Sequence, residues 1–151
     1  RAVPAPGGLG YVGDIVEVRT ALLESLLLAG FTPVVAPVAP PADGDPAGVP
    51  LNVNADYAAA AVAGALGAAQ LLFISDVPGL RLDGVTQPTI AAAEIDALIG
   101  RGVAADGMVT KLRAASAALR AGVRAVRIGD LRLLDDPTAG TRVLATSHQL
   151  A

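Results

Sequence analysis

Lys111 is the only lysine in the chain, whereas ten arginines supply the other cationic side chains. It lies four positions after Gly107, about one turn into the helix that the pattern over 108–121 predicts. A glycine before a helix lets backbone N–H groups approach an anion, and the helix dipole adds positive charge there, so a lysine needs a compensating anion. Its compact ammonium suits one oxygen of a phosphoryl group, where arginine would need a different geometry. The alternative is an exposed lysine, or one paired with Asp106.

Other polar side chains follow the predicted strands, which is where ligands bind in open α/β sheets. Asn52, Asn54 and Asp56 stand within five residues at the predicted start of a helix, and Ser75 and Asp76 follow a later strand. Asn54 or Asp56 could act only as the N-cap of its helix, and this alternative stays open. A helix cap needs only one side chain, whereas this segment has two asparagines and an aspartate. The additional polar groups favour a site in which amides bind a substrate and a carboxylate orients cations.

The chain lacks the groups that most other reaction classes require. It has no cysteine, and its single histidine, His148, lies three residues from the end. These counts exclude hydrolytic triads, Cys-ligated zinc and His-rich metal sites. A helix dipole, a lysine and a carboxylate remain. Phosphoryl transfer to an anionic acceptor such as a carboxylate is the reaction least in need of a base, because positioning and charge neutralisation supply nearly all of the catalysis.

Composition narrows the class of protein. A length of 151 residues is typical of one domain. The net charge of -3 and the presence of only four Phe and Tyr side chains argue against a nucleic-acid-binding surface. No apolar run approaches the roughly 18 residues that a membrane span needs, and no signal-peptide pattern is present, so we expect a cytoplasmic protein without a membrane partner. Because the first residue is Arg, we expect a piece of a longer chain or a partial reading frame.

Helical patterns alternate with short apolar runs along the chain. The sequence predicts helices over 20–29, from about residue 54 to Gly67, over 90–99 and over 108–121. It predicts a tight hairpin turn at Asp83–Gly84. Strands are predicted at "TPVVAPVA" (32–39), in "AQLLFISDVPGL" (69–80), which ends in a polar turn, and at "VRAVRIGD" (123–130) and "GTRVLA" (140–145). Such alternation with short connections predicts an α/β fold, a three-layer α/β/α sandwich with a mainly parallel sheet.

Taken together, these segments resemble acetylglutamate kinases of the amino acid kinase family. The segments that carry the resemblance are "LGYVG", "LLLAGFTPVVAPVA", "LNVNADYAA", "ISDVPGL", "ADGMVTK" and "GTRVLA", in the family's order and rough spacing. The resemblance covers nearly the whole chain. It implies MgATP-dependent phosphorylation of the side-chain carboxylate of N-acetyl-L-glutamate, a step of arginine biosynthesis, with ATP as the nucleotide and Mg²⁺ carried on its phosphates rather than by a protein ligand.

The resemblance also assigns roles to individual residues. Asn52 resembles the asparagine that binds acetylglutamate, with Asn54 as a second substrate-binding candidate. Asp56 resembles the aspartate that holds the catalytic lysines in place, and Lys111 resembles the lysine that stabilises the transferring phosphoryl group. The nucleotide-binding residues that the resemblance implies are Ser75, Asp76, Val77, Asp106, Gly107 and Met108.

The covered region resembles the second half of such a kinase, with residues 1–66 as the end of the substrate-binding lobe and 67–151 as the ATP-binding lobe. The 151 residues contain no counterpart of the family's first strand with its lysine or of the glycine-rich loop that follows that strand. We therefore expect an exposed sheet edge and apolar surface that favour self-association, as in a homo-oligomer. Two alternatives stay open: a non-catalytic nucleotide-binding or assembly remnant, and a kinase of carrier-linked aminoadipate in lysine biosynthesis. The "NVNAD" and "SDVPG" segments favour acetylglutamate over the latter.

Overall fold

The computed structural model describes residues 1–43, 48–104 and 106–145. In chain order its elements are β1 (Ala2–Pro4), β2 (Val12–Ile15), α1 (Ala21–Leu28), β3 (Val38–Ala39), β4 (Leu51–Val53), α2 (Ala55–Ala65), β5 (Gln70–Ile74), β6 (Arg81–Leu82), β7 (Val85–Thr86), β8 (Thr89–Ala91), the 3₁₀ helix η1 (Ala92–Glu94), α3 (Ile95–Gly100), α4 (Asp106–Arg120), β9 (Ala125–Gly129), the 3₁₀ helix η2 (Leu131–Leu134) and β10 (Thr141–Leu144). Helices and strands alternate, so the predicted α/β class is confirmed.

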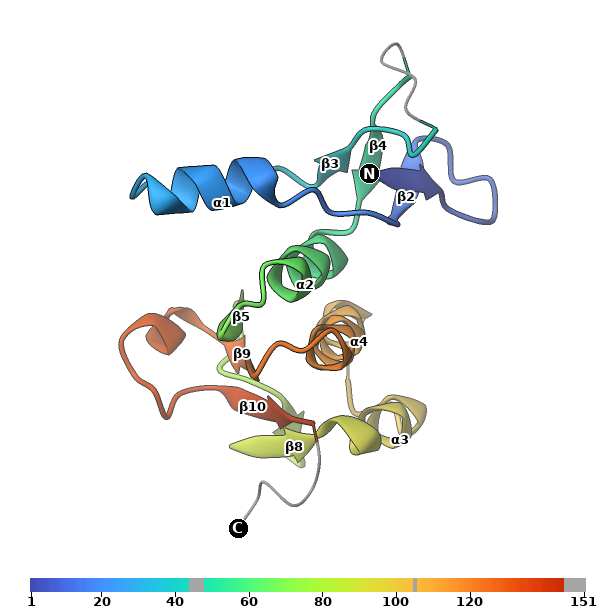
Figure 1. Cartoon of the computed structure of the whole chain (residues 1–151). Helices are drawn as coiled ribbons and strands as arrows, with labels where there is room; N and C mark the ends of the chain where they lie inside the picture. The colour runs from blue at the N-terminus through green and yellow to red at the C-terminus, as the bar shows by residue number, and fades with distance from the viewer. Residues whose placement is uncertain (44–47, 105, 146–151) are drawn as a thin grey trace.

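The strands form two four-stranded sheets and a small hairpin (Figure 1). The first sheet has the order β1-β2-β4-β3 and the second has the order β5-β9-β10-β8. In the first sheet only β2 and β4 are parallel; in the second, β5 is parallel to β9 and β10 to β8, while β9 and β10 are antiparallel. The ladders are therefore mixed, where the sequence predicted a mainly parallel sheet. Buried apolar runs predict strands but not the direction in which they pair.

The main core lies between the second sheet and the helices beside it. One face of α4 is fully buried, with Leu112, Ala114, Ala115 and Ala118 at 0% exposure. Alternate residues of β9, Val126 and Ile128, pack against this face, as the two-residue period of a strand requires. The small alanines let α4 lie close to the sheet. Figure 1 shows α3 and α4 on one side of this sheet and α2 between the two sheets.

Two predicted elements are confirmed close to their expected limits in the first half of the chain. Helix α1 lies within the predicted range and ends at Leu28, two residues before Gly30, whose φ of 81° is readily adopted by glycine. Helix α2 begins after Asn54 and ends before Gly67. No residue of α1 is buried, however, and its Leu22 and Leu28 are 69% and 90% exposed. The apolar face that predicted this helix is thus only partly covered by the described residues: Leu23 and Leu26 are half-buried, and the other leucines are exposed.

The predicted buried strand over 32–39 is wrong as stated. Only Val38–Ala39 forms a strand, and it pairs antiparallel to β4. Residues 32–37 belong to no helix or strand, and Val34 is 96% exposed. Apolar, β-branched composition favours burial in a sheet, but a strand also needs a neighbour to pair with. The pairing with β4 reaches back only to Pro37, whose carbonyl accepts the Val53 N–H at 2.9 Å.

The remaining predictions hold with one correction. The hairpin of β6 and β7 turns at Asp83 and Gly84, both with positive φ (49° and 82°), as a tight two-residue hairpin requires. The predicted helix over 90–99 is wrong at its start: Ile90 and Ala91 lie in β8, and α3 begins only at Ile95. In the three described ranges, no helix has the length and apolar character that a membrane crossing requires.

Candidate functional site

An ion pair between Lys111 and Asp56 joins the two principal helices. Lys111 Nζ lies 3.0 Å from Asp56 Oδ1 and 3.2 Å from Oδ2, so the ammonium bridges both carboxylate oxygens. The side chains are only 19% and 18% exposed, and the pair is partly withdrawn from water. A pair that is 55 residues apart in sequence and half-enclosed is held by the fold rather than by local chain geometry. The structure therefore places Lys111 against Asp56, whereas the side chain of Asp106 lies outside the described residues.

Helices α2 and α4 run parallel, so that their N-termini lie at the same end. Asp56 in the first turn of α2 meets Lys111 in the second turn of α4, while at the other end Gly64 meets Ala121. A Cβ on Gly64 would lie 2.6 Å from the Cβ of Ala121, closer than real carbon contacts allow. Gly64 thus permits the close approach of the helices that brings Lys111 and Asp56 together. Two positive helix ends then converge on the pair.

The two asparagines occupy different positions around the start of α2. Asn54 is the N-cap: its Oδ1 accepts hydrogen bonds from the N–H groups of Asp56 and Tyr57, at 3.0 and 3.2 Å. The carboxamide oxygen of Asn54 therefore acts as the helix cap, as the capping alternative predicted. Asn52 lies in the centre of β4, between the buried Leu51 and Val53, and its own side chain is exposed on the opposite face. The substrate-binding roles of both asparagines stay predictions.

The predicted nucleotide residues lie at the ends of two further elements. Ser75 and Asp76 directly follow β5, and the Ser75 hydroxyl lies 3.1 Å from Asp76 Oδ1 in a hydrogen bond that the hydroxyl donates. The Ser75 N–H donates to the carbonyl of Gly129, at the end of β9, at 2.7 Å. Val77 follows in the same turn and is half-buried. Because β5 and β9 are parallel, this turn lies at their shared carboxyl end, the position at which ligands bind beside parallel strands in α/β folds.

The first turn of α4 has the chemistry of an anion site. Gly107 is exposed, and a Cβ built on it would meet no other described part of the chain within 4 Å. Met108 is half-buried and packs against the main core. The N–H groups of a helix's first turn, the helix dipole and the Lys111 ammonium one turn further on all favour a phosphate oxygen. These residues fit a phosphate group. In the described ranges no three His, Cys, Asp or Glu side chains come together to hold a metal ion.

The sequence did not indicate a role for two residues near the candidate site, Thr141 and Gly79. Thr141, at the start of β10, is completely buried, and its hydroxyl bonds to the chain segment that follows Ser75. Gly79, in that segment, packs directly on the Thr141 hydroxyl. The only signals in the sequence are a glycine in "DVPGL" and a threonine in "GTRVLA", and neither reveals that the two segments meet.

An exposed ion pair follows β9 at the same sheet edge. Arg132 donates from Nε and Nη2 to both carboxylate oxygens of Asp130, at 2.9 to 3.2 Å. This hydrogen bonding lowers the pKa of the Asp130 carboxyl and raises that of the Arg132 guanidinium. Asp130 Oδ1 also accepts the Arg132 N–H and so caps η2. The hydroxyl of Thr138 similarly lowers the pKa of Asp136. Both carboxylates order the connection from β9 to β10 and do not contact Lys111.

The comparison with protein families decides the class of the chain. Residues 2–130 match the amino acid kinase family. The chain belongs to this family. Among curated amino acid kinases, the acetylglutamate kinase of Chloroflexus aurantiacus strain J-10-fl is 48% identical over 139 residues, which are 92% of this chain and 53% of the relative. The acetylglutamate kinase of Thermus thermophilus is also 48% identical, over 81% of this chain and 47% of the relative. This amino acid kinase chain thus spans about half the length of the curated relatives it matches.

Solved structures support the same family. A protein from Streptococcus mutans UA159 superposes with a TM-score of 0.85 at 31% identity, over 96% of this chain and 56% of that one. N-acetylglutamate synthase from Neisseria gonorrhoeae, complexed with coenzyme A and L-arginine, gives a TM-score of 0.81 at 28% identity, over 96% and 35%. Carbamate kinase from Giardia lamblia bound to AMP-PNP shares the fold at 23% identity, with a TM-score of 0.70 over 88% and 46%.

Proposed function

We propose that this chain belongs to an ATP-dependent kinase that phosphorylates the side-chain carboxylate of N-acetyl-L-glutamate, a cytoplasmic step of arginine biosynthesis. The observation that carries the proposal is the half-enclosed Lys111–Asp56 pair at the convergent ends of two helices. Identity of 48% to curated acetylglutamate kinases over 92% of the chain supports the choice of substrate. The pair also supports transfer chemistry because it holds a lysine charge, 19% exposed, in the second turn of α4, where it can face a phosphoryl group at the start of that helix.

In the proposed reaction, a carboxylate oxygen of acetylglutamate attacks the γ-phosphorus of ATP as the bond to the β-phosphate oxygen breaks. The acceptor is already anionic, so no base has to remove a proton, and ADP leaves with the bonding electron pair. Negative charge on the transferring group must be stabilised from fixed positions. The Lys111 ammonium supplies that charge, and the Asp56 carboxylate, bound to it at 3.0 and 3.2 Å, fixes its place.

The surrounding residues divide the binding of the two substrates between them. We assign the Ser75–Val77 turn and the Asp106–Met108 turn to the nucleotide, since the first follows the carboxyl end of β5 and the second begins helix α4. Asn52 and Asn54 are assigned to the acetylglutamate. The first sheet then belongs to the substrate-binding lobe and the second to the ATP-binding lobe, which corresponds to residues 1–66 and 67–151. Magnesium, when bound, travels with the ATP phosphates and neutralises part of their charge.

An acyl-phosphate assay tests this proposal. Protein expressed from its complete gene is mixed with MgATP and N-acetyl-L-glutamate, and hydroxylamine traps any acyl phosphate as a hydroxamate. We expect hydroxamate to form with N-acetyl-L-glutamate and not with carrier-linked aminoadipate. Faster reaction with the aminoadipate substrate would reassign the pathway to lysine biosynthesis. Absence of hydroxamate with both substrates from a folded protein would contradict the kinase proposal and support the remnant.

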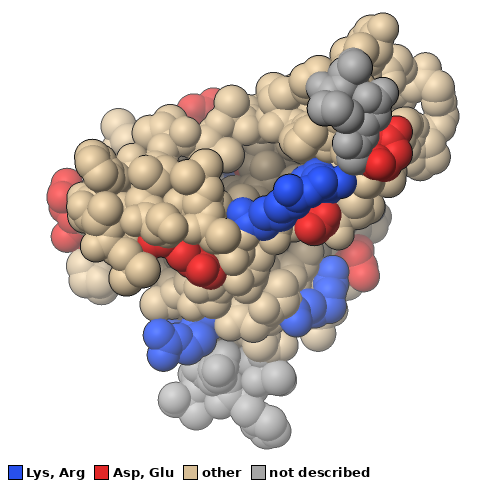
Figure 2. All heavy atoms as spheres, turned by 45° about the horizontal axis from the view of Figure 1, so that its top comes forward, with Lys and Arg blue, Asp and Glu red and all other residues tan. Residues whose placement is uncertain are grey.

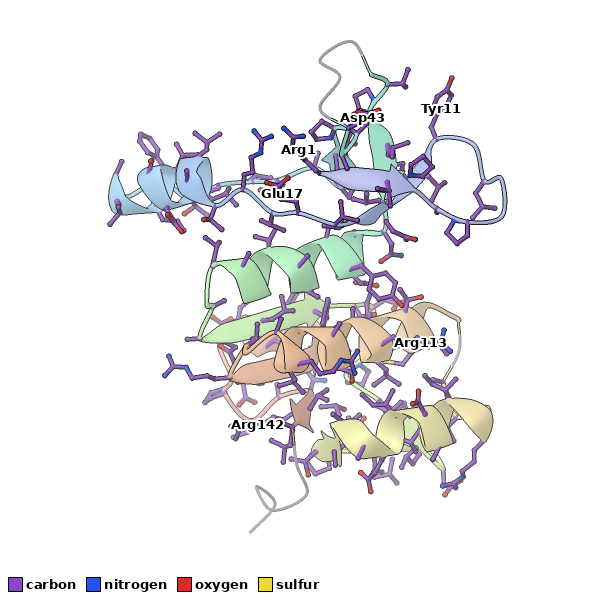
Figure 3. All side chains as sticks on the ribbon, turned by 45° about the vertical axis from the view of Figure 1, so that its right-hand side comes forward. Arg1, Tyr11, Glu17, Asp43, Arg113 and Arg142 are labelled. Carbon is purple, nitrogen blue, oxygen red and sulfur yellow. The ribbon has the colours of Figure 1, made fainter. Side chains whose placement is uncertain are left out.

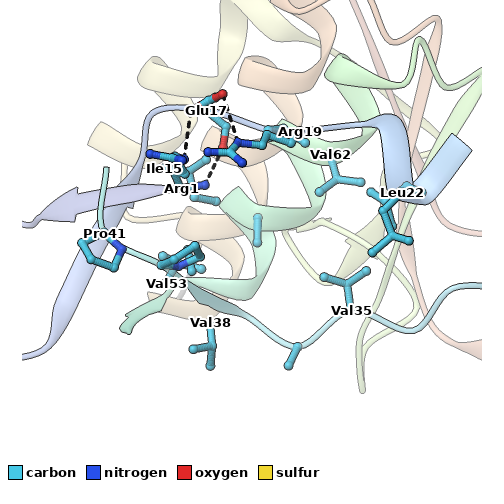
Figure 4. Close-up of a pocket in the computed structure, with 16 residues that line it drawn as sticks. Arg1, Ile15, Glu17, Arg19, Leu22, Val35, Val38, Pro41, Val53 and Val62 are labelled. Atoms are coloured by element: carbon cyan, nitrogen blue, oxygen red, sulfur yellow. Dashed lines mark hydrogen bonds and ion pairs between the residues drawn. The ribbon is translucent and has the colours of Figure 1, made fainter. Parts of the chain in front are cut away.

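The apolar surface of the first half leads to a prediction about assembly. A cavity of about 690 Å³ opens between α1, the first sheet and α2, and its apolar lining includes Leu22, Val35, Val53 and Val62 (Figure 4). Figure 2 shows this side hollowed, and Figure 3 shows Arg1 and Glu17 close together above α2, where their side chains are 3.4 Å apart. Exposed apolar surface of this kind promotes association in water.

We therefore expect the 151-residue chain to associate with itself. The substitution Leu22→Gln should weaken this association, because Leu22 is 69% exposed on the open face of α1. Leu131→Gln is the matched control, since Leu131 is 68% exposed but lies on η2, away from the cavity. Sedimentation velocity over a range of concentrations measures the effect. Equal sedimentation of the two variants would show that α1 does not drive assembly.

A further inference from the structure

The hydroxyl of Thr141 is a buried junction between three chain segments. Thr141 is 0% exposed at the start of β10. Its Oγ1 accepts a hydrogen bond from the Leu80 N–H at 2.8 Å and donates one to the Gln87 carbonyl at 2.7 Å. Leu80 and Gln87 are themselves joined, because the Gln87 N–H donates to the Leu80 carbonyl at 2.8 Å. Residues 76–88 connect β5 to β8, and one side-chain hydroxyl therefore holds together the two ends of this connection.

Glycines pack this junction so closely that no side chain fits between its parts. A Cβ on Gly79 would lie 2.6 Å from Thr141 Oγ1, and the φ of 149° at Gly79 is one that other residues rarely adopt. A Cβ on Gly129 would lie 3.1 Å from the Pro78 carbonyl oxygen and 3.0 Å from the Cα of Gly140. The segment after Ser75 thus lies directly on the backbones of β9 and β10.

The turn between Ser75 and Leu80 is consequently held at both ends. Its first residue is bound through the Ser75 N–H to the carbonyl of Gly129, and its last through the Leu80 N–H to Thr141. We propose that Thr141 is a positioning residue for nucleotide binding, which acts by fixing the turn that carries Ser75, Asp76 and Val77. This inference rests on the proposed assignment of that turn to the nucleotide.

The chemistry of the hydroxyl makes the role specific. A hydroxyl can donate one hydrogen bond and accept another at the same time, and Thr141 uses both capacities. Valine has nearly the same shape but can do neither, so Thr141→Val leaves the buried Leu80 N–H and the partly buried Gln87 carbonyl without their partner. Serine keeps the hydroxyl and loses only a methyl group. The pair of variants separates the hydrogen bonds from packing.

The test compares these variants in protein expressed from its complete gene. Hydrogen exchange of residues 75–80 reports the order of the turn, and calorimetric titration gives the Kd of MgATP. We expect Thr141→Val to speed hydrogen exchange in residues 75–80 and to raise the Kd about tenfold. A tenfold rise corresponds to the loss of about one hydrogen bond that holds the turn in place. Thr141→Ser should stay within about threefold of the parent protein on the same scale. The control is Val143→Ala, which creates a cavity in the core two residues further along β10. It should leave the Kd of MgATP unchanged.

Each outcome supports or overturns the inference. If the parent protein binds MgATP and Thr141→Val binds it equally well, Thr141 does not position the nucleotide turn, although the proposed function stands. If the parent protein is folded and does not bind MgATP, the nucleotide assignment itself fails. Should Thr141→Val fail to fold, Gly79→Ala disturbs the same turn from the opposite side and must raise the Kd. A rise of the same size in Val143→Ala would assign the effect to general loss of stability.

Discussion

Lys111→Arg is expected to lower kcat for acyl-phosphate formation about 100-fold in protein expressed from its complete gene, the usual loss when one stabilising contact to a developing charge is removed. Arginine keeps the positive charge and can still pair with Asp56, so the fold should survive. Its planar guanidinium, however, cannot place a compact charge on one phosphoryl oxygen from the same backbone position. Steady-state hydroxamate assays at saturating MgATP and acetylglutamate measure the effect.

The control for this substitution lies on the same helix. Arg113 is exposed two residues further along α4, and Arg113→Lys exchanges the same two residue types in the opposite direction. We expect its kcat to equal that of the parent protein. If Lys111→Arg turns over at the normal rate, Lys111 does not stabilise the transferring phosphoryl group, and the proposed role is wrong.

Asp56→Asn is expected to have the second largest effect. The amide has the shape of the carboxylate but not its charge, so the Lys111 ammonium, only 19% exposed, loses its counter-ion. Hydrogen bonds to charged groups contribute about 1.5–3 kcal/mol, and we expect a loss of unfolding free energy of this order for Asp56→Asn. Transfer should also slow, because the ammonium is no longer held in one place.

A double-mutant cycle measures the pair itself. Urea unfolding of Asp56→Asn, Lys111→Met and the double variant gives the coupling free energy between the two side chains, which we expect to be about 1–2 kcal/mol. In that case the double variant is more stable than the sum of the single losses implies. Additive losses would mean that the two side chains do not interact in solution, and that Asp56 cannot act by holding Lys111. The paired variants serve as each other's controls.

Local features of the sequence were easier to interpret than the pairing of strands. Lys111 stood out because its residue type and its place near a helix start are unusual together, and the structure sets it against Asp56. Local signals such as Gly30 and the Asp83–Gly84 turn also predicted element ends correctly, since backbone conformation there depends on a residue's own φ preference.

Long-range pairing was where the sequence analysis failed. The run over 32–39 has the composition of a buried strand, yet only its last two residues find a partner. Ile90 and Ala91 fit a helical period equally well, and their place in β8 depends on β10, some fifty residues later. The Thr141 junction could not be predicted for the same reason. A single hydroxyl that bonds to Leu80 and Gln87 produces no periodic pattern in the sequence.

The most direct test of the central claim is calorimetric titration of MgATP into the folded protein, with Lys111→Ala as the comparison. The proposed site predicts saturable binding to the parent protein and weaker binding to Lys111→Ala, because the ammonium at the start of α4 is the only lysine charge that the chain offers to the phosphates. Binding that Lys111→Ala leaves unchanged, or no binding by folded parent protein, would contradict the assignment of Lys111 to the nucleotide phosphates.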